Sequence, residues 1–565
     1  MNATDDNDNN STTLPHRWSN VPSLDDVWTH VLSPRLSSYT IESVRTKFAG
    51  QIDIDKMTEH FRSTFRHYFT MKDLRNTIAH KMGHDTAHRL LQIIHLRLAD
   101  PTKNPPLHIF TYGGSVVAGS DSYWNDWWLP NTTIGNKRKQ SAPFVWTLPW
   151  PFRLEDLWND VIFGGREVVQ VHNLGTRGAS TEMGVLSLEY GMFGDIRDKI
   201  TGKAVVPDVI IHAYGNNDIL QYRTDESMYE QHRQFVEAAR KLRCNEDHLP
   251  AVVFFDDHIG LDDKIKQDGH YVSLRIFRSI SQLSSWHDLL AVSFPNAFRH
   301  VHYADSTRMR LGVGDYIHPG LLYHYGVAPW LLTYGILSGF LDTCRDEQLP
   351  SRPDRPEDMS VPHIPPLKED QYRVPPFTET WGNYTVEAKE RCASSSDTSQ
   401  SMTSMCVSSS WIANHVGGIV DPKDILSKMD AMNLTGNNGW SISGRKYGIT
   451  PAAWDARRGG ATFTITVSNP TGMYLELVLI SLVSYGESWE RARLRITARH
   501  PDNNANLGTF DVGAAHKLPT SISSKHKFEF DPSTFRPGSP IEARFDLIGG
   551  RVFTIRGILF CSNAS

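Results

Sequence analysis

The chain has 565 residues, more than the roughly 250–300 residues that one hydrophobic core usually supports, so we expect two domains. Hydrophobic residues make up 39% and charged residues 21%, and the formal net charge of -5 provides no broad basic field for nucleic acid. The longest apolar stretch, Gly326 to Leu341, contains Pro329 and is shorter than the ~20 residues that cross a bilayer. We therefore predict a buried helix there, no transmembrane segment in this chain and no nucleic-acid partner.

The first hundred residues divide into two stretches. Residues 1–22 are polar, rich in Asn and Asp, and lack the basic and apolar regions of a secretory signal, so we predict a disordered N-terminus. Residues 23–104 carry helical periodicity, clearest from Ala87 to Leu96, and predict a helical N-terminal arm. The compartment stays open: we lean toward the secretory pathway if a leader is missing, with the cytoplasm as the alternative.

Short apolar runs alternate with helix-like segments across residues 105–345. The runs are rich in β-branched residues and almost continuously apolar, as in strands buried on both faces of a parallel sheet; they are residues 107–112, 168–171, 209–213 and 251–255. This alternation predicts a doubly wound α/β catalytic domain, in which sites form beyond the carboxyl ends of the strands.

A second, all-β region follows a proline-rich segment. Residues 346–378 are charged and rich in proline and predict an extended linker. Within residues 379–565, strand-like runs separated by Gly, Pro and Asn turns alternate apolar and polar residues, most clearly from Arg491 to Ile496 and from Lys525 to Phe530. We predict an antiparallel β-sandwich, a fold that carbohydrate-binding modules also use.

Four short segments place reactive or small residues at the end of an apolar run or in a turn. Ser115 follows a glycine pair directly after the first strand-like run, as a nucleophile that a strand presents in a turn. The others supply glycine, asparagine and an acid–histidine pair; they are Asn173 to Gly178, Gly215 to Asp218, and Asp315 to His318. Each segment alone is a weak signal, but the four together, in this order, are a strong one.

In this order the segments resemble the four sequence blocks of the SGNH (GDSL-type) serine hydrolases, over about residues 105–345. The family's first block is commonly Gly-Asp-Ser, whereas Gly114 stands here in place of the aspartate. The chemistry does not need that aspartate, and Gly-Gly-Ser followed by Val-Val-Ala-Gly resembles a eukaryotic branch of the family. The resemblance implies an SGNH-like fold and an ester hydrolase, with the β-sandwich appended.

The resemblance also implies a role for each site residue. Ser115 would be the nucleophile, His318 its base, and Asp315 the group that holds the imidazole in the needed tautomer. The oxyanion hole would consist of the backbone N–H groups of Ser115 and Gly178 and the side-chain amide of Asn217. Gly175 is the alternative to Gly178 as the glycine of the oxyanion hole.

Other polar and aromatic clusters have simpler interpretations. A metal site on one helix face is conceivable, but without a carboxylate or cysteine partner a solvated surface is favoured; its histidines are His80, His84, His88 and His95. We predict a local loop for Asp256-Asp257-His258. The five cysteines lack metal-type spacing, although Cys392 and Cys406 are candidates to pair. We expect no metal and no cofactor.

Tryptophans crowd the segment after Ser115 and recur in the β-rich region. Most are expected to be packing residues, with a glycan-stacking platform as the alternative; they are Trp124, Trp127, Trp128, Trp146, Trp150, Trp158, Trp440, Trp454 and Trp489.

The sequence favours a serine esterase acting on a carboxylic ester, with acetyl as the expected acyl group and a carbohydrate or similar small molecule as the expected alcohol. Three alternatives remain. A lipid or acyl-thioester hydrolase and an acyltransferase would use the same site, and a non-catalytic glycan-binding protein would keep the fold without turnover. The sequence does not separate hydrolysis from transfer and does not predict an oligomeric state.

Overall fold

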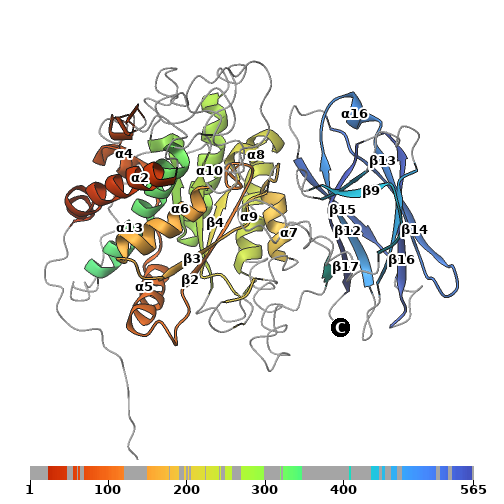
Figure 1. Ribbon diagram of the computed structural model, residues 1–565, viewed down its shortest axis with the longest axis horizontal. Coiled ribbons are helices and arrows are strands. Elements are labelled where there is room, and N and C mark those ends of the chain that lie inside the picture. The colour runs from red at the N-terminus through yellow and green to blue at the C-terminus, as the bar shows by residue number, and fades with distance from the viewer. Residues whose placement is uncertain are drawn as a thin grey trace, which may run out of the picture.

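The computed structural model describes most of two regions of the chain, and all statements below concern these residues. They are residues 23–47, 55–56, 58–59, 61–63, 69–119, 149–176, 178–189, 196–198, 202, 205–222, 224–240, 242, 249–257, 269–297, 319, 322–346, 406–408, 434–443, 448–451, 460–467, 474–516, 522–531, 538–550 and 552–562. Figure 1 shows an α/β part formed by the earlier residues and, beside it, a β-sandwich formed by the later ones. No described helix is both long enough and apolar enough to cross a membrane.

The α/β part is built on a six-stranded sheet in the order β1-β6-β5-β4-β2-β3. Its strands are β1 (Ile78–His80), β2 (Leu107–Gly113), β3 (Val169–Asn173), β4 (Val209–Ala213), β5 (Ala251–Asp256) and β6 (Leu290–Ser293). All neighbours from β2 to β6 are parallel, whereas β1 pairs antiparallel with β6 at the edge. The predicted doubly wound sheet is confirmed, and the antiparallel edge strand is an addition that the apolar runs did not indicate.

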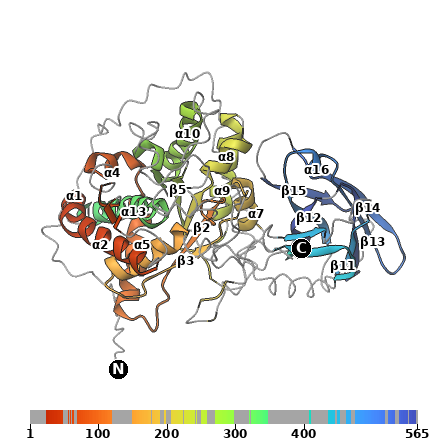
Figure 2. The same cartoon turned by 45° about the horizontal axis from the view of Figure 1, so that its top comes forward.

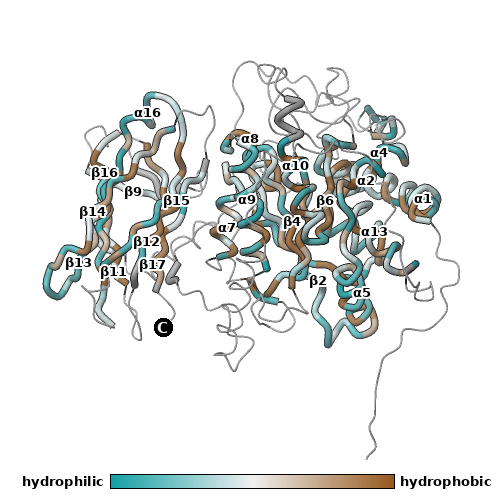
Figure 3. Tube along the Cα trace, turned by 180° about the vertical axis from the view of Figure 1, so that it is seen from behind, coloured by the Kyte–Doolittle hydropathy of each residue, from teal (hydrophilic) through white to brown (hydrophobic). Residues whose placement is uncertain are grey.

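Helices cover both faces of this sheet, and its central strands β2, β4 and β5 are buried at every position. In β2, Ile109 belongs to one hydrophobic core and its neighbour Phe110 to the other, as the two-residue period of a strand requires. The first core is covered by α2 (Ser33–Lys47), α5 (His84–Ala99), α6 (Trp150–Asp156) and α13 (Ala328–Asp346). The second is covered by α7 (Thr181–Glu189), α9 (Asp225–Arg240) and α10 (Gly269–His287). Figure 3 shows the apolar strands enclosed by helices with polar outer faces.

The helices before residue 100 pack into the first core. They include α1 (Leu24–Val27), a π-helical turn (Trp28–Leu32) and α4 (Met71–Thr77). Trp28 is buried and makes an edge-to-face contact with Trp330 of α13, with ring centroids 6.0 Å apart. Figure 2 shows α1, α2 and α5 grouped around α13, so this stretch forms part of the layer on the sheet.

The β-sandwich consists of two antiparallel sheets, which confirms the predicted fold of this region. One sheet has the order β15-β12-β17-β10-β9, with β7 also paired to β17, and the other β14-β13-β16-β11-β8. The strands are β7 (Cys406–Ser408), β8 (Leu434–Asn438), β9 (Trp440–Ser443), β10 (Gly448–Pro451), β11 (Thr462–Val467), β12 (Tyr474–Val483), β13 (Arg493–Arg499), β14 (Asn506–Gly513), β15 (Ile522–Glu529), β16 (Ile541–Gly549) and β17 (Thr554–Ser562). Inward-facing residues of both sheets form one core. In this core the rings of Phe463 and Phe545 stack with their centroids 4.6 Å apart.

Strand β12 is buried on both of its faces, which joins the sandwich to the α/β part. Leu477 and Leu479 face the sandwich core, whereas Val478 and Ile480 belong to the second core of the α/β part. Leu559 of β17 joins them there. The two parts therefore share a continuous apolar interface, and Figure 1 shows α7 as the helix that faces the sandwich.

Some sequence predictions fall outside the described residues. These are the N-terminal residues 1–22 and residues 347–378 of the proline-rich linker. Cys392 also lies outside them, so its pairing with Cys406 is not described. Cys561 is disulfide-bonded and lies opposite Cys406 in the β17–β7 ladder.

Candidate active site

Three of the predicted site residues lie at the carboxyl edge of the sheet. Ser115 follows β2, Gly178 follows β3, and Asn217 lies in the first turn of α8 (Gly215–Gln221), which follows β4. These three strands are adjacent, in the order β4-β2-β3, and the direction in which the sheet is built reverses between β2 and β4. Such a reversal is where doubly wound sheets open a crevice for ligands.

The glycine pair before Ser115 lets the chain turn sharply against its neighbours. A Cβ on Gly113 would lie 2.1 Å from Cγ2 of Val117 and 2.3 Å from the carbonyl oxygen of Ala213, so no side chain fits there. The chain then turns back on itself, since the Ala118 N–H donates to the Gly114 carbonyl at 3.1 Å. This geometry presents Ser115, which is 8% exposed, at the end of the strand.

Asn217 occupies the space that a side chain at position 114 would need. A Cβ on Gly114 would lie 2.8 Å from Nδ2 and 2.9 Å from Cγ of Asn217. The Asn217 amide therefore lies against the residue that precedes Ser115. The glycine at 114, where the family commonly has aspartate, leaves room for this amide.

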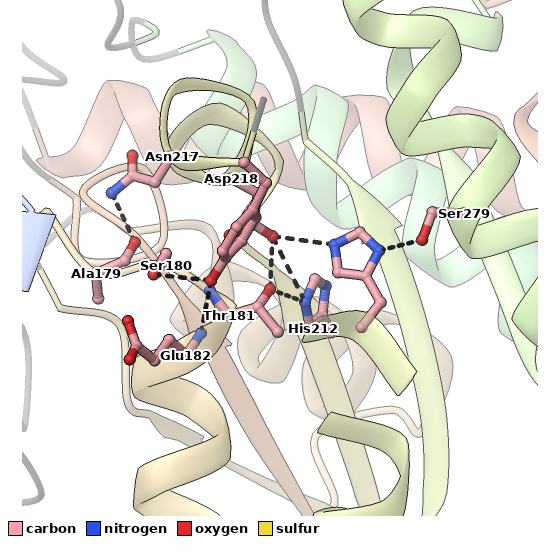
Figure 4. Close-up of polar contacts among 10 residues, drawn as sticks. Ala179, Ser180, Thr181, Glu182, His212, Asn217, Asp218 and Ser279 are labelled. Atoms are coloured by element: carbon pink, nitrogen blue, oxygen red, sulfur yellow. Dashed lines mark hydrogen bonds and ion pairs between the residues drawn. The ribbon is translucent and has the colours of Figure 1, made fainter. Parts of the chain in front are cut away.

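The segment 178–182 is held by hydrogen bonds at every residue. The Gly178 carbonyl accepts from the backbone N–H of Ser523 at 2.9 Å, and the Ala179 carbonyl accepts from Nδ2 of Asn217 at 2.6 Å. Tyr222 contacts the next residues, because its hydroxyl donates to Oγ of Ser180 at 3.4 Å and accepts from the Glu182 N–H at 3.2 Å. Figure 4 shows the contacts of Ala179, Ser180 and Glu182 in this segment.

Thr181 connects this segment to a buried cluster that the sequence did not reveal. Asp218 accepts from the Thr181 N–H at 2.8 Å and from its hydroxyl at 2.5 Å, and its Oδ2 lies 3.0 Å from Nε2 of His232. Nδ1 of His232 lies 2.7 Å from Oγ of Ser279, and Nε2 of His212 lies 2.6 Å from the Thr181 hydroxyl. The one signal in the sequence was His212, a polar residue in the otherwise apolar β4.

The cluster is fully buried, and hydrogen bonding accounts for its polar atoms. Burial, reinforced by the charge of His232, holds the pKa of His212 well below its usual value, so this imidazole is neutral. One ligand atom from each of His212, Asp218 and His232 lies within 4.8 Å of the others, a group that a metal ion could use. The Thr181 hydroxyl contacts both His212 and Asp218, which supports a hydrogen-bonded network that fixes the 178–182 segment.

Asp257 lies next to the Asn217 turn on the other side. The Asn216 amide donates to the Asp257 carbonyl at 3.0 Å. Burial and the negative charges of Asp256 and Asp218 raise the pKa of Asp257, and burial and the Asp257 charge raise that of Tyr323. Tyr323 also packs against Phe294, the residue directly after β6, with ring centroids 5.4 Å apart. Asp315, His318 and His258 themselves lie outside the described residues.

The remaining sequence predictions have mixed outcomes. Trp150, Trp158 and Trp440 are buried packing residues, Trp489 packs partly buried against the sandwich core, and the other predicted platform residues lie outside the described part; they are Trp124, Trp127, Trp128, Trp146 and Trp454. The placement of the four histidines on one helix face is wrong for His80. That residue ends β1, because the backbone pairs with β6 there, and its Nδ1 lies 3.0 Å from the Leu289 carbonyl oxygen.

Comparisons with known proteins give structural neighbours only. No family model and no curated protein matches the sequence. A two-domain esterase (CEX) active on acetylated mannans is 14% identical and covers 87% of this chain and 99% of its own, with a TM-score of 0.42. AlinE4, a SGNH-hydrolase family esterase, is 17% identical and covers 44% of this chain and 98% of its own, with a TM-score of 0.24. The xylan-binding module CBM15 is 15% identical and covers 23% of this chain and 86% of its own, with a TM-score of 0.19. The neighbours are thus SGNH-type esterases and carbohydrate-binding modules, and at these scores the chemistry has to be argued from the site itself.

Proposed function

We propose that this protein is a serine esterase that hydrolyses a carboxylic ester, with Ser115 as its nucleophile. The observation that carries the proposal is the meeting of Ser115, Gly178 and Asn217 in the loops after three adjacent parallel strands, at the reversal point of the sheet. A nucleophile, a glycine with a φ of 67° and a neutral amide donor thus share one edge. These are the nucleophile and the oxyanion donors that acyl transfer requires, and the proposal assigns the base to His318.

In the proposed reaction, His318 removes the proton from the Ser115 hydroxyl as its oxygen attacks the ester carbonyl. Asp315 holds the imidazole in the needed tautomer and stabilises its protonated form. The Ser115 and Gly178 N–H groups and the Asn217 amide stabilise the negative oxygen, each by about 2.7–4 kcal/mol. His318 then protonates the leaving alcohol, which leaves an acyl-enzyme. Water, deprotonated by the same imidazole, releases the acid and restores Ser115.

The proposed substrate is an acetyl ester of a carbohydrate hydroxyl. The β-sandwich supports this, because it lies against α7 and the 178–182 segment and so borders the site. A lipid substrate would need an apolar groove or an amphipathic entrance beside Ser115. The carbohydrate assignment otherwise depends on fold-level analogy with binding modules.

The decisive experiment is covalent labelling with a fluorophosphonate probe, because the probe reacts with an activated serine. We expect the native protein to be labelled and Ser115→Ala to be unlabelled, and Ser115→Ala to lose ester hydrolysis by about 10⁴-fold or more. Thermal unfolding of both proteins provides the control for folding. An unlabelled native protein would favour a binding role over catalysis.

Hydrolysis of p-nitrophenyl esters of different chain lengths tests the acyl group. We expect acetyl to be the preferred acyl group, together with release of acetate from acetylated polysaccharide. A strong preference for long chains would overturn the carbohydrate assignment and favour a lipid or acyl-thioester hydrolase.

A further inference from the structure

Strand β15 of the sandwich reaches the loop that carries the candidate oxyanion glycine. The backbone N–H of Ser523 donates to the Gly178 carbonyl at 2.9 Å. β15 is the outermost strand of its sheet and pairs only with β12 among the described strands. The Ser523 N–H therefore points away from the ladder and bonds to the other part of the molecule.

The surrounding contacts hold this strand in place. Arg556, which is 2% exposed, donates to Oγ of Ser523. Val478 and Ile480 of the neighbouring β12 are fully buried in the core that they share with α7. At the start of α7, burial raises the pKa of Glu182, while a hydrogen bond from Gln221 and the positive charge of Lys525 on β15 lower it. Apolar packing, a backbone hydrogen bond and opposite charges thus meet at one interface.

We propose that the β-sandwich is a structural part of the oxyanion hole, with Ser523 as a positioning residue that acts through Gly178. This inference rests on the proposed esterase function. Gly178 has a φ of 67°, and a glycine there has no Cβ to restrain the peptide planes on either side of it. The bond from Ser523 fixes the plane that follows Gly178, and the bond from Asn217 to Ala179 fixes the next carbonyl. In this proposal, anchoring the two carbonyls keeps the Gly178 N–H, which belongs to the preceding peptide, directed toward the site.

This arrangement predicts that the sandwich affects turnover itself. A binding module on a tether changes how tightly a polymer is held and leaves the chemical step on a small ester unchanged. A strand that positions an oxyanion donor changes kcat even for a small ester, because a donor that moves by about 1 Å can cost up to roughly 10²-fold.

Ser523→Pro tests the inference in the full chain. Proline lacks the N–H that Gly178 accepts, and an edge strand tolerates proline where its N–H faces away from the ladder. We expect kcat on p-nitrophenyl acetate to fall about 10- to 100-fold with KM changed less than about 3-fold. Glu529→Ala is the control: this side chain lies at the other end of β15 and is 75% exposed, so the variant should keep kcat within about 2-fold.

A charge exchange tests the same docking without proline. Lys525→Glu reverses the charge that lowers the pKa of Glu182, on the strand that contacts α7, and should lower kcat by weakening the contact between β15 and α7. Adding Glu182→Lys restores opposite charges and should recover most of the lost kcat. Recovery in the double variant separates docking from a general loss of folding, which a second substitution would not repair.

The possible outcomes are distinct. A native enzyme with Ser115-dependent activity, together with a folded Ser523→Pro variant whose kcat is unchanged, overturns this inference and leaves the proposed function standing. A native protein without Ser115-dependent activity overturns both. If Ser523→Pro does not fold, failure of the charge exchange to restore kcat overturns the inference.

Discussion

The α/β part and the β-sandwich place their polar residues differently. Every residue of β2, β4 and β5 is buried, whereas β11 and β13 alternate between buried inner and more exposed outer positions. The outer positions of these strands carry charged side chains, as in the exposed ion pair between Arg495 and Asp511. The α/β part instead encloses polar groups such as His212 and Asp218 in hydrogen-bonded networks.

This difference predicts which substitutions change turnover and which change the stability of the fold. Exposed ion pairs such as Arg495 with Asp511 contribute little to stability because water and salt screen them, so the outer face of the sandwich tolerates change. Enclosed polar groups near the carboxyl edge of the sheet position the loops around Ser115. Substitutions there should change turnover, and substitutions in the sandwich should change stability, with the Ser523 contact as the exception.

Asn217→Ala should give the largest effect among the loop substitutions. It removes a donor that is used mainly in the transition state, so we expect kcat to fall by roughly 10²–10³ with little change in KM. Steady-state kinetics on p-nitrophenyl acetate measures both constants. Asn216→Ala is the control, because its amide bonds to the Asp257 carbonyl instead, and it should keep most of the activity. A loss expressed through KM alone would contradict the assigned role.

Much of this comparison could be predicted from the sequence, because the spacing of apolar residues along a strand reflects which of its faces are buried. Continuous apolar runs predicted strands covered on both faces, and alternating runs predicted the sandwich. The placement of Ser115, Gly178 and Asn217 at strand ends followed from the same runs. The antiparallel β1 was missed because a strand of only three residues has no readable period, and His80 was assigned to a helix for that reason.

Contacts between distant segments could not be predicted. Nothing in the residue types shows that Thr181 lies between His212 and Asp218, because the fold alone brings these segments together. The same holds for Ser523, whose backbone N–H is chemically like any other and gains its role from the docking of β15. Asp315 and His318 remain predictions from the sequence.

Gly114→Ala should have an intermediate effect through the same amide. The new Cβ would lie 2.8 Å from Nδ2 of Asn217, so this side chain must move, which its flexible end allows at moderate cost. We expect kcat to fall about 10-fold. In an Asn217→Ala background the same substitution should cost almost nothing, since its target is gone. An equal loss in both backgrounds would show that Gly114 acts by another route.

His526→Gln should have the smallest effect on catalysis and a visible one on stability, as expected for the sandwich. Burial lowers the pKa of His526 on β15 from 6.5 to about 4, and its Nε2 lies 3.0 Å from Oγ of Ser481. The unfolded chain therefore binds a proton below about pH 6.5 that the folded protein does not take up until about pH 4. The folded state loses roughly 2 kcal/mol between pH 7.5 and pH 5 through this residue.

Urea unfolding at pH 7.5 and pH 5 measures that loss. The variant should be less sensitive to acid by the same roughly 2 kcal/mol while its kcat at pH 7.5 stays within about 2-fold of the native value. Burial also lowers the pKa of His287 to about 4, but this contribution is present in both proteins and cancels in the comparison. Equal acid sensitivity of the two proteins would mean that the His526 imidazole becomes hydrated when it is protonated, so that its pKa is not lowered. A fall in kcat would mean that contacts of β15 other than that of Ser523 also affect the site.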